Sequence, residues 1–196
     1  MNITPLFSKP LYTNELNKNL LSIAHITNPL KSENNKSKTS KDFYVLETTE
    51  NAFLKTIIEK EIKTFLNDHL KYVNNFKITT SWFTEIGKQQ ESHNHPHHNC
   101  FVSGVLYLQT ANNCGNIIFE DMSNRRFQIE THEFNELNSS AWSIKPFNGL
   151  IIMFPSEVWH KVELNNSDII RHSLSFNVMP TGLIGNKFGD NQLYYE

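Results

Sequence analysis

The chain from Phe76 onward consists of short apolar runs separated by turn-forming residues. The runs are rich in Val, Ile, Phe, Thr and Trp, and Gly, Asn, Pro and Ser lie between them. Many short strands with few helices between them are typical of an antiparallel sandwich or barrel, and they argue against a parallel α/β sheet. We therefore expect a mainly β fold with strands at residues 77–85, 100–110, 115–121, 143–145, 149–154, 159–164 and 169–178.

The pattern of the first 75 residues predicts extended and helical segments that support this β region. Residues 1–13 contain two prolines that oppose a helix, so an extended segment is expected there. Residues 14–25 predict a short helix, and residues 28–42, rich in Ser, Lys and Asn, predict a loop. Large apolar side chains recur near the helical period at about residues 50–70. This longer helix should pack by its apolar side on the outer face of the barrel.

A chain of 196 residues can bury the core of one domain without disulfides. We expect a single domain with N-terminal support at residues 1–75, a barrel core at 76–182 and a tail at 183–196. Cys100 and Cys114 fit two thiols in a reducing compartment, with one disulfide as the alternative.

Charge and hydropathy narrow the classes of partner. The net charge is −2 and the sequence pI is about 6.5, and no basic patch with interleaved aromatic residues is present. Nucleic acid is therefore an unlikely partner. The longest apolar stretch, residues 150–154, is too short to cross a bilayer, and the N-terminus does not resemble a signal peptide. We expect a soluble cytoplasmic protein with no membrane contact.

The strongest chemical signal is the segment HNHPHHNC, with histidines at positions 93, 95, 97 and 98. Alternate residues of a strand point to the same face, so His93 and His95 can converge on one ion. Two imidazoles occupy two positions around a metal and leave the third to a residue elsewhere in the chain. For an isolated HxH pair, a histidine-rich surface loop is the alternative interpretation.

His160 and Arg171 are the next residues of this pattern. The turn-rich residues 164–168 predict an antiparallel hairpin in which His160 lies opposite Ser173. Arg171 would then be diagonal to His160, at about 7–8 Å between backbones. That separation suits a small dicarboxylate with one end on a metal and the other on the guanidinium. The opposite face of the second strand would offer the helix an apolar stripe: Ile170, Leu174, Phe176 and Val178.

In this order, the motifs resemble the 2-oxoglutarate/Fe(II) oxygenases, and more narrowly their small members in marine phages and bacteria. The resemblance covers most of the chain. It rests on His93-Asn94-His95, residues 103–108, 115–119 and 149–160, and Arg171-His172-Ser173. It implies a double-stranded β-helix, which is a jelly-roll, cupin-like barrel.

The resemblance also implies the roles of several residues. His93, His95 and His160 would hold Fe(II), while Arg171, with help from Ser173, would bind the distal carboxylate of 2-oxoglutarate. Most of the superfamily has a carboxylate as second ligand where this chain offers His95. Other residues that could supply a ligand instead are Glu91, His97, Glu120 and Asp121.

Tyr107 has the strand parity to face the pocket, where its hydroxyl could donate a hydrogen bond to the cosubstrate. The alternative is an aromatic side chain that only packs in the barrel.

The implied activity is that of a dioxygenase, in which 2-oxoglutarate and O₂ are consumed, succinate and CO₂ are released, and a substrate is hydroxylated by default. Two other classes stay open: a metal cupin without 2-oxoglutarate, such as a three-His dioxygenase or isomerase, and a non-catalytic jelly-roll binding module. The substrate is defined no further than a small molecule or a protein side chain. Residues 28–42 and 123–141 would form a lid or substrate rim, or else plain connections.

Overall fold

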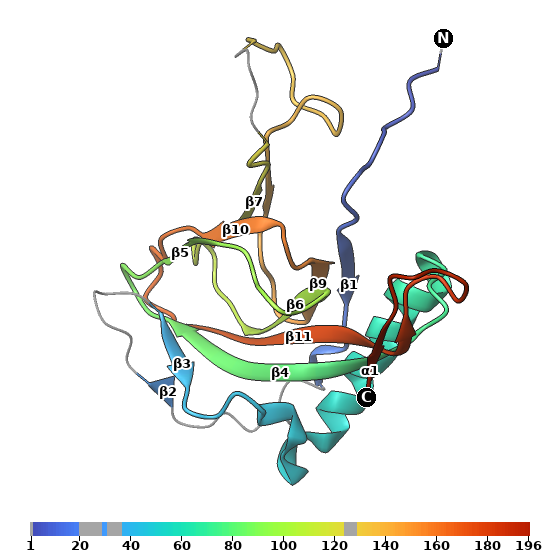
Figure 1. The fold of residues 1–196 in the computed structure, drawn as a ribbon. Helices are drawn as coiled ribbons and strands as arrows, with labels where there is room; N and C mark the ends of the chain where they lie inside the picture. Colours follow the sequence, from blue (N-terminus) through green and yellow to red (C-terminus); the bar gives the residue numbers. More distant parts are fainter. Residues whose placement is uncertain (1, 20–28, 31–36, 124–128) are drawn as a thin grey trace.

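Two antiparallel sheets form the body of the computed structural model, which describes residues 2–19, 29–30, 37–123 and 129–196 (Figure 1). The larger sheet has the order β1 (Tyr12–Glu15), β9 (Leu150–Pro155), β6 (Val102–Gln109), β11 (Arg171–Ile184), β4 (Asn75–Ile86), β3 (Lys38–Ser40) and β2 (Pro29–Leu30). A further strand, β12 (Leu193–Tyr195), pairs with the end of β11. The smaller sheet has the order β5 (Ser92–His95), β10 (Trp159–Val162), β7 (Ile117–Glu120) and β8 (Ala141–Ile144). This architecture confirms the predicted double-stranded β-helix.

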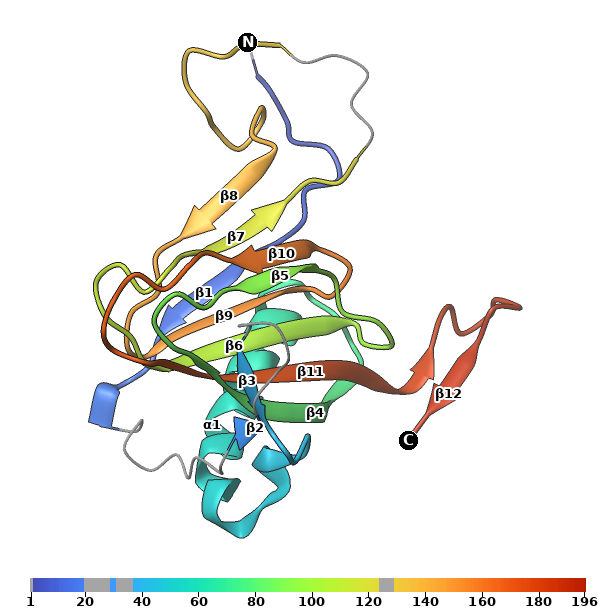
Figure 2. The same ribbon diagram turned by 90° about the vertical axis from the view of Figure 1, so that its left-hand side faces the viewer.

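The longer predicted helix is present, and it covers the outer face of the larger sheet. Two short 3₁₀ turns, η2 (Val45–Glu47) and η3 (Thr49–Asn51), lead into α1 (Ala52–Lys63), which continues as a π-helical turn, η4 (Thr64–His69). Figure 2 shows α1 on one side of the larger sheet and the smaller sheet on the other. Within the described residues, no helix is long and apolar enough to cross a membrane.

Side-chain alternation on the central strands separates two apolar cores. On β11, Leu174, Phe176 and Val178 pack with the buried face of the helix, as predicted. Ile170, the fourth member of the predicted stripe, precedes the strand and is 42% exposed. The second core lies between the two sheets and contains Tyr107 and Phe154 among others. One face of β11 therefore supports the fold, while the other is free to line a site.

Gly104 lies where the backbone of β6 passes closest to a core ring. A Cβ at this position would lie 2.2 Å from Cζ of Phe176, its register partner on β11. No side chain fits into that gap, so glycine lets the two strands pair over a fully buried phenylalanine.

The predicted hairpin between residues 159–164 and 169–178 is wrong. β10 belongs to the smaller sheet and β11 to the larger one, so the connection crosses from one sheet to the other. Asn165, fully buried, organises this crossing: its Nδ2 donates to the carbonyl oxygens of Ile86 (2.8 Å) and Ile169 (2.9 Å). Its Oδ1 accepts from the backbone N–H of Ser167 at 2.9 Å. These side-chain bonds replace the strand ladder that a hairpin would need.

The N-terminal predictions hold only in part. Residues 14–15 belong to β1 instead of a helix, because β1 pairs with β9 (Tyr12 opposite Met153) and this pairing overrides local preference. The predicted loop at 28–42 includes β2 and β3, and Thr39 of β3 lies opposite Thr84 of β4. Residues 20–25 of the predicted helix, and residues 28 and 31–36 of the predicted loop, lie outside the described residues.

Candidate metal centre

A cavity of about 290 Å³ lies between the two sheets. The inward faces of β4, β6 and β11 line one side with Trp82, Thr84, Tyr107, Arg171, Ser173 and Ser175. The smaller sheet lines the other side with Ser92, His95, Ile117, His160 and Val162. The larger sheet therefore brings Arg171 and several hydroxyl groups to the cavity, beside apolar residues such as Ile86 and Val105, and the smaller sheet brings His95 and His160.

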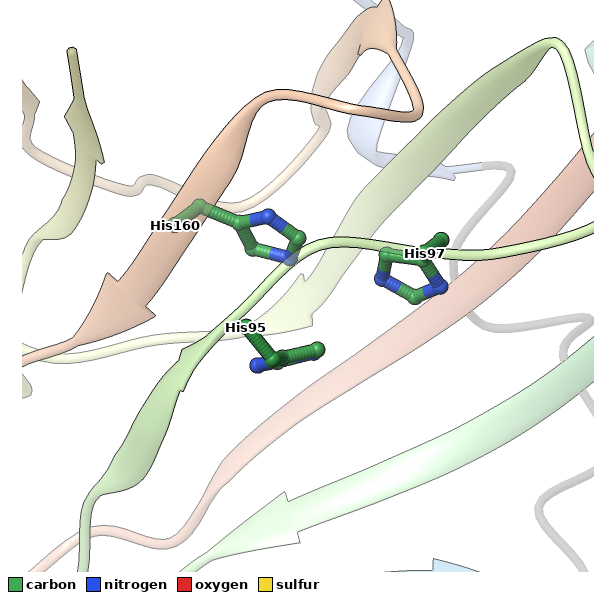
Figure 3. A group of neighbouring side chains, drawn as sticks. All are labelled: His95, His97 and His160. Carbon is green, nitrogen blue, oxygen red and sulfur yellow. The ribbon is translucent and has the colours of Figure 1, made fainter. Parts of the chain in front are cut away.

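His95, His97 and His160 bring one imidazole nitrogen each within 4.8 Å of one another (Figure 3). His95 ends β5 and lies directly opposite His160 of β10. The chain leaves the sheet at Pro96, and the backbone N–H of His97 donates to the Ser156 carbonyl at 2.9 Å. This turn returns the third imidazole to the same point, so the three residues could hold one metal ion.

Backbone contacts set the orientation of two of these rings. Nδ1 of His95 lies 2.8 Å from the carbonyl oxygen of His93, and Nδ1 of His160 lies 3.0 Å from that of Val158. When Nδ1–H donates to a carbonyl, the Nε2 lone pair is free for a metal. Both rings therefore present the nitrogen that ligation requires.

Burial keeps the three imidazoles in their neutral form. Desolvation, together with a smaller effect of the neighbouring histidines, lowers the pKa of His160 to about 3 and that of His97 to about 4. The pKa of His95 is also lowered, mainly by burial. Because a metal binds the neutral imidazole, the ligands need lose no proton at neutral pH.

His93 lies outside this three-residue group. It is exposed, its ring centre is 4.8 Å from that of His95, and it lines the cavity. The ladder between β10 and β5 is irregular here: His160 opposes His95, but Val162 opposes Ser92. This bulge disturbs the alternation that placed His93 beside His95. Ligation by His93 stays a prediction, and the three-residue group contains His97, one of the alternative ligands, in its place.

The carboxylates considered as alternative ligands make other contacts. Glu120 accepts from Asn94 Nδ2 at 2.6 Å and from Lys161 Nζ at 2.5 Å. Asp121 accepts from the backbone and hydroxyl of Ser123, and Glu91 is exposed. None of the three joins the histidine group among the described residues.

Arg171 is a buried cation on the opposite wall. It is 2% exposed, and its guanidinium carbon lies 5.6 Å from the centre of the Tyr107 ring. Nη1 donates to the Gly115 carbonyl at 3.3 Å, whereas Nε is buried and has no partner within the described residues. Burial lowers the pKa of Arg171, but a guanidinium remains charged in proteins. With no Asp or Glu among the lining residues, this end of the cavity suits an anion.

Tyr107 and Ser173 flank this cation. They are register partners on β6 and β11, both are buried, and both line the cavity. Burial raises the pKa of Tyr107 to about 12, so its hydroxyl keeps its proton. Tyr107 also packs in the core between the sheets, so both interpretations of this residue describe part of its environment.

The part of the chain that carries these residues matches a known family. The model of a family described as "Putative 2OG-Fe(II) oxygenase" matches residues 80–177, half of the chain. No match was found among curated proteins. The chain belongs to this 2-oxoglutarate/Fe(II) oxygenase family, as the sequence motifs predicted. The matches give no support to a phage or marine origin.

Solved structures of oxygenases have the same fold. HygX from Streptomyces hygroscopicus, with nickel and 2-oxoglutarate bound, aligns with a TM-score of 0.63 at 8% identity over 88% of this chain and 84% of that one. A Pseudomonas putida prolyl-4-hydroxylase aligns with a TM-score of 0.60 at 15% identity, over 89% of this chain and 95% of that one. A viral collagen prolyl hydroxylase from Paramecium Bursaria Chlorella virus-1 aligns with a TM-score of 0.56 at 14% identity, over 86% of this chain and 94% of that one. These likenesses are evidence for the fold alone.

Proposed function

We propose that the chain is an Fe(II)- and 2-oxoglutarate-dependent dioxygenase that hydroxylates a small molecule or a protein side chain. The observation that carries the proposal is a group of three imidazoles that shares one cavity with a buried, partly unpartnered arginine. Family membership supplies the expected pair of ligands, Fe(II) and 2-oxoglutarate. The residues present fit both of them.

His95, His97 and His160 would hold the iron through one nitrogen each. Three ligands on one side leave open positions for a cosubstrate and for O₂. When bound, Fe(II) supplies the oxidative chemistry by which 2-oxoglutarate is converted to succinate and CO₂ and the substrate is oxidised. Neutral imidazoles do not offset the charge of the metal, so an incoming dianion is attracted both by the iron and by Arg171.

Arg171 would bind the distal carboxylate of 2-oxoglutarate. Its Nε is the buried donor that lacks a partner, and a planar guanidinium can give a carboxylate two parallel hydrogen bonds. Ser173 and Tyr107 flank the same end of the cavity, and the hydroxyl of each can donate one hydrogen bond to the carboxylate. Tyr107 also packs under the guanidinium and limits the directions in which it can turn.

Apolar side chains would keep water away from the reacting groups. Phe154 packs edge-on against the ring of His160, with 4.8 Å between ring centres, and Ile117 and Val162 also line the cavity. Excluding water strengthens the interactions between the charged groups inside.

The proposal is tested by the formation of succinate. Protein reconstituted with Fe(II) in aerated buffer should convert 2-oxoglutarate to succinate slowly, even without the hydroxylation substrate, and a chelator should stop this reaction. If no succinate forms at any 2-oxoglutarate concentration, or if it forms equally well without iron, the proposed activity is wrong.

A further inference from the structure

Trp82 is an aromatic residue of the larger sheet that contacts His97, one of the candidate metal ligands. It lies on β4, lines the cavity, and packs against His97 with 5.7 Å between ring centres and 30° between ring planes. Phe43 packs against Trp82 in turn, with 6.2 Å between ring centres. His97 also stacks on His160 at 5.1 Å with an angle of 3°. The imidazole of His97 is thus held by aromatic contacts.

His97 differs from the other two histidines in what sets its orientation. His95 and His160 each have an Nδ1 contact with a backbone carbonyl, and both lie on strands. Among the described residues, no hydrogen bond involves the ring nitrogens of His97, and the residue follows the end of β5. Neither a ladder nor a ring hydrogen bond therefore fixes the direction in which its nitrogens point.

We propose that Trp82 is a positioning residue for the metal centre, because its indole ring keeps the imidazole of His97 in the ligating orientation. The inference rests on the proposed site of His95, His97 and His160. A hydrogen bond normally orients a metal-binding histidine, and losing that support costs about 10–100-fold in metal affinity. For His97, contact with the Trp82 ring takes the place of that bond.

The test is a titration of the metal-free protein with Co(II), followed by the absorption of the bound ion. Trp82→Leu removes the flat ring and should weaken Co(II) binding by about tenfold or more. It should also change the absorption band, since the third imidazole is released. Trp82→Phe keeps an aromatic face and should bind Co(II) nearly as tightly as the parent. Ser175→Ala is the matched control, because Ser175 is the register partner of Trp82 and lines the same cavity.

A double-mutant cycle separates positioning from general damage to the fold. If Trp82 acts through His97, Trp82→Leu should have little further effect on Co(II) binding in a His97→Ala background. The inference is overturned if Trp82→Leu binds Co(II) as tightly as the parent, or if it weakens binding equally in both backgrounds. A different result would contradict the metal site itself. In that case His95→Ala and His160→Ala would bind Co(II) like the parent protein.

Discussion

The guanidinium carbon of Arg171 lies 5.6 Å from the centre of the Tyr107 ring, on the wall of the cavity that faces His160. The two strands that carry Arg171 and His160 belong to different sheets, so the cavity spans the space between the sheets. A small diacid could therefore bridge a metal on one sheet and a cation on the other.

Replacing Arg171 with Ala should weaken 2-oxoglutarate binding while leaving Co(II) binding intact. A buried hydrogen bond to a charged group contributes about 1.5–3 kcal/mol, so we expect a roughly tenfold to hundredfold rise in Kd. Calorimetric titration of the Co(II)-loaded protein with 2-oxoglutarate measures this Kd. Lys88→Ala is the control, because Lys88 forms an exposed ion pair with Asp168. Equal loss of metal and cosubstrate binding would contradict the assigned role.

Single alanine variants distinguish the two possible sets of metal ligands. We expect His95→Ala, His97→Ala and His160→Ala to lower Co(II) affinity by at least about tenfold, since each removes a ligand. His93→Ala should retain metal binding, and the exposed His98 offers a second control in the same segment. Equilibrium dialysis with metal analysis gives the affinities. A loss at His93 without a loss at His97 would restore the set predicted from sequence.

The protein without metal should lose stability as the pH falls from about 6.5 towards 4. The folded state keeps His97 and His160 unprotonated down to pKa values of about 4 and 3, while in the unfolded chain both protonate near 6.5. Below pH 6.5 the unfolded state thus binds more protons, so the free energy of unfolding decreases as the pH falls. Urea unfolding at a series of pH values measures this slope.

A variant with Gln at both positions, His97 and His160, should show a shallower slope over the same interval. The exposed His132 provides the control, since His132→Gln should leave the slope unchanged. A stability that is constant between pH 6.5 and 4 in the parent would mean that the two imidazoles are not desolvated.

Gly104→Ala should destabilise the fold without acting on the chemistry of the site. The new Cβ would lie 2.2 Å from Cζ of the buried Phe176, and overpacking of this kind costs about 1–3 kcal/mol. Thermal unfolding should show a lower Tm, whereas Gly189→Ala, whose Cβ would lie 3.2 Å from Cβ of the exposed Asn186, should lower the Tm far less. An unchanged Tm for Gly104→Ala would mean that Phe176 can move out of the way.

Most of the barrel could be predicted from sequence, because each central strand carries its own pattern. The strands around Val105, Ile152 and Leu174 combine β-branched or large apolar residues with flanking turns, and they form where expected. β1 and β3 could not be predicted because they are short strands with polar sequences. Their pairing comes from the neighbouring strand and leaves no apolar alternation in the sequence.

Some residues of the candidate site could likewise be predicted from the sequence, and others could not. The residues named from the motifs line one cavity, and their roles there stay predictions: His93, His95, His160, Arg171, Ser173 and Tyr107. Strand alternation favours positions 93 and 95 over His97, because a bulge beside His95 is not visible in the sequence. The histidine that follows Pro96 was the available signal, since a proline after a strand often marks a change in chain direction.

The central claim is tested most directly by adding 2-oxoglutarate to the Co(II)-loaded protein without oxygen and recording the absorption of the bound ion. We predict a saturable change in the Co(II) band that needs far more 2-oxoglutarate in the Arg171→Ala variant. A band that stays constant at every 2-oxoglutarate concentration would show that the diacid does not reach the metal, and the proposed function would be wrong.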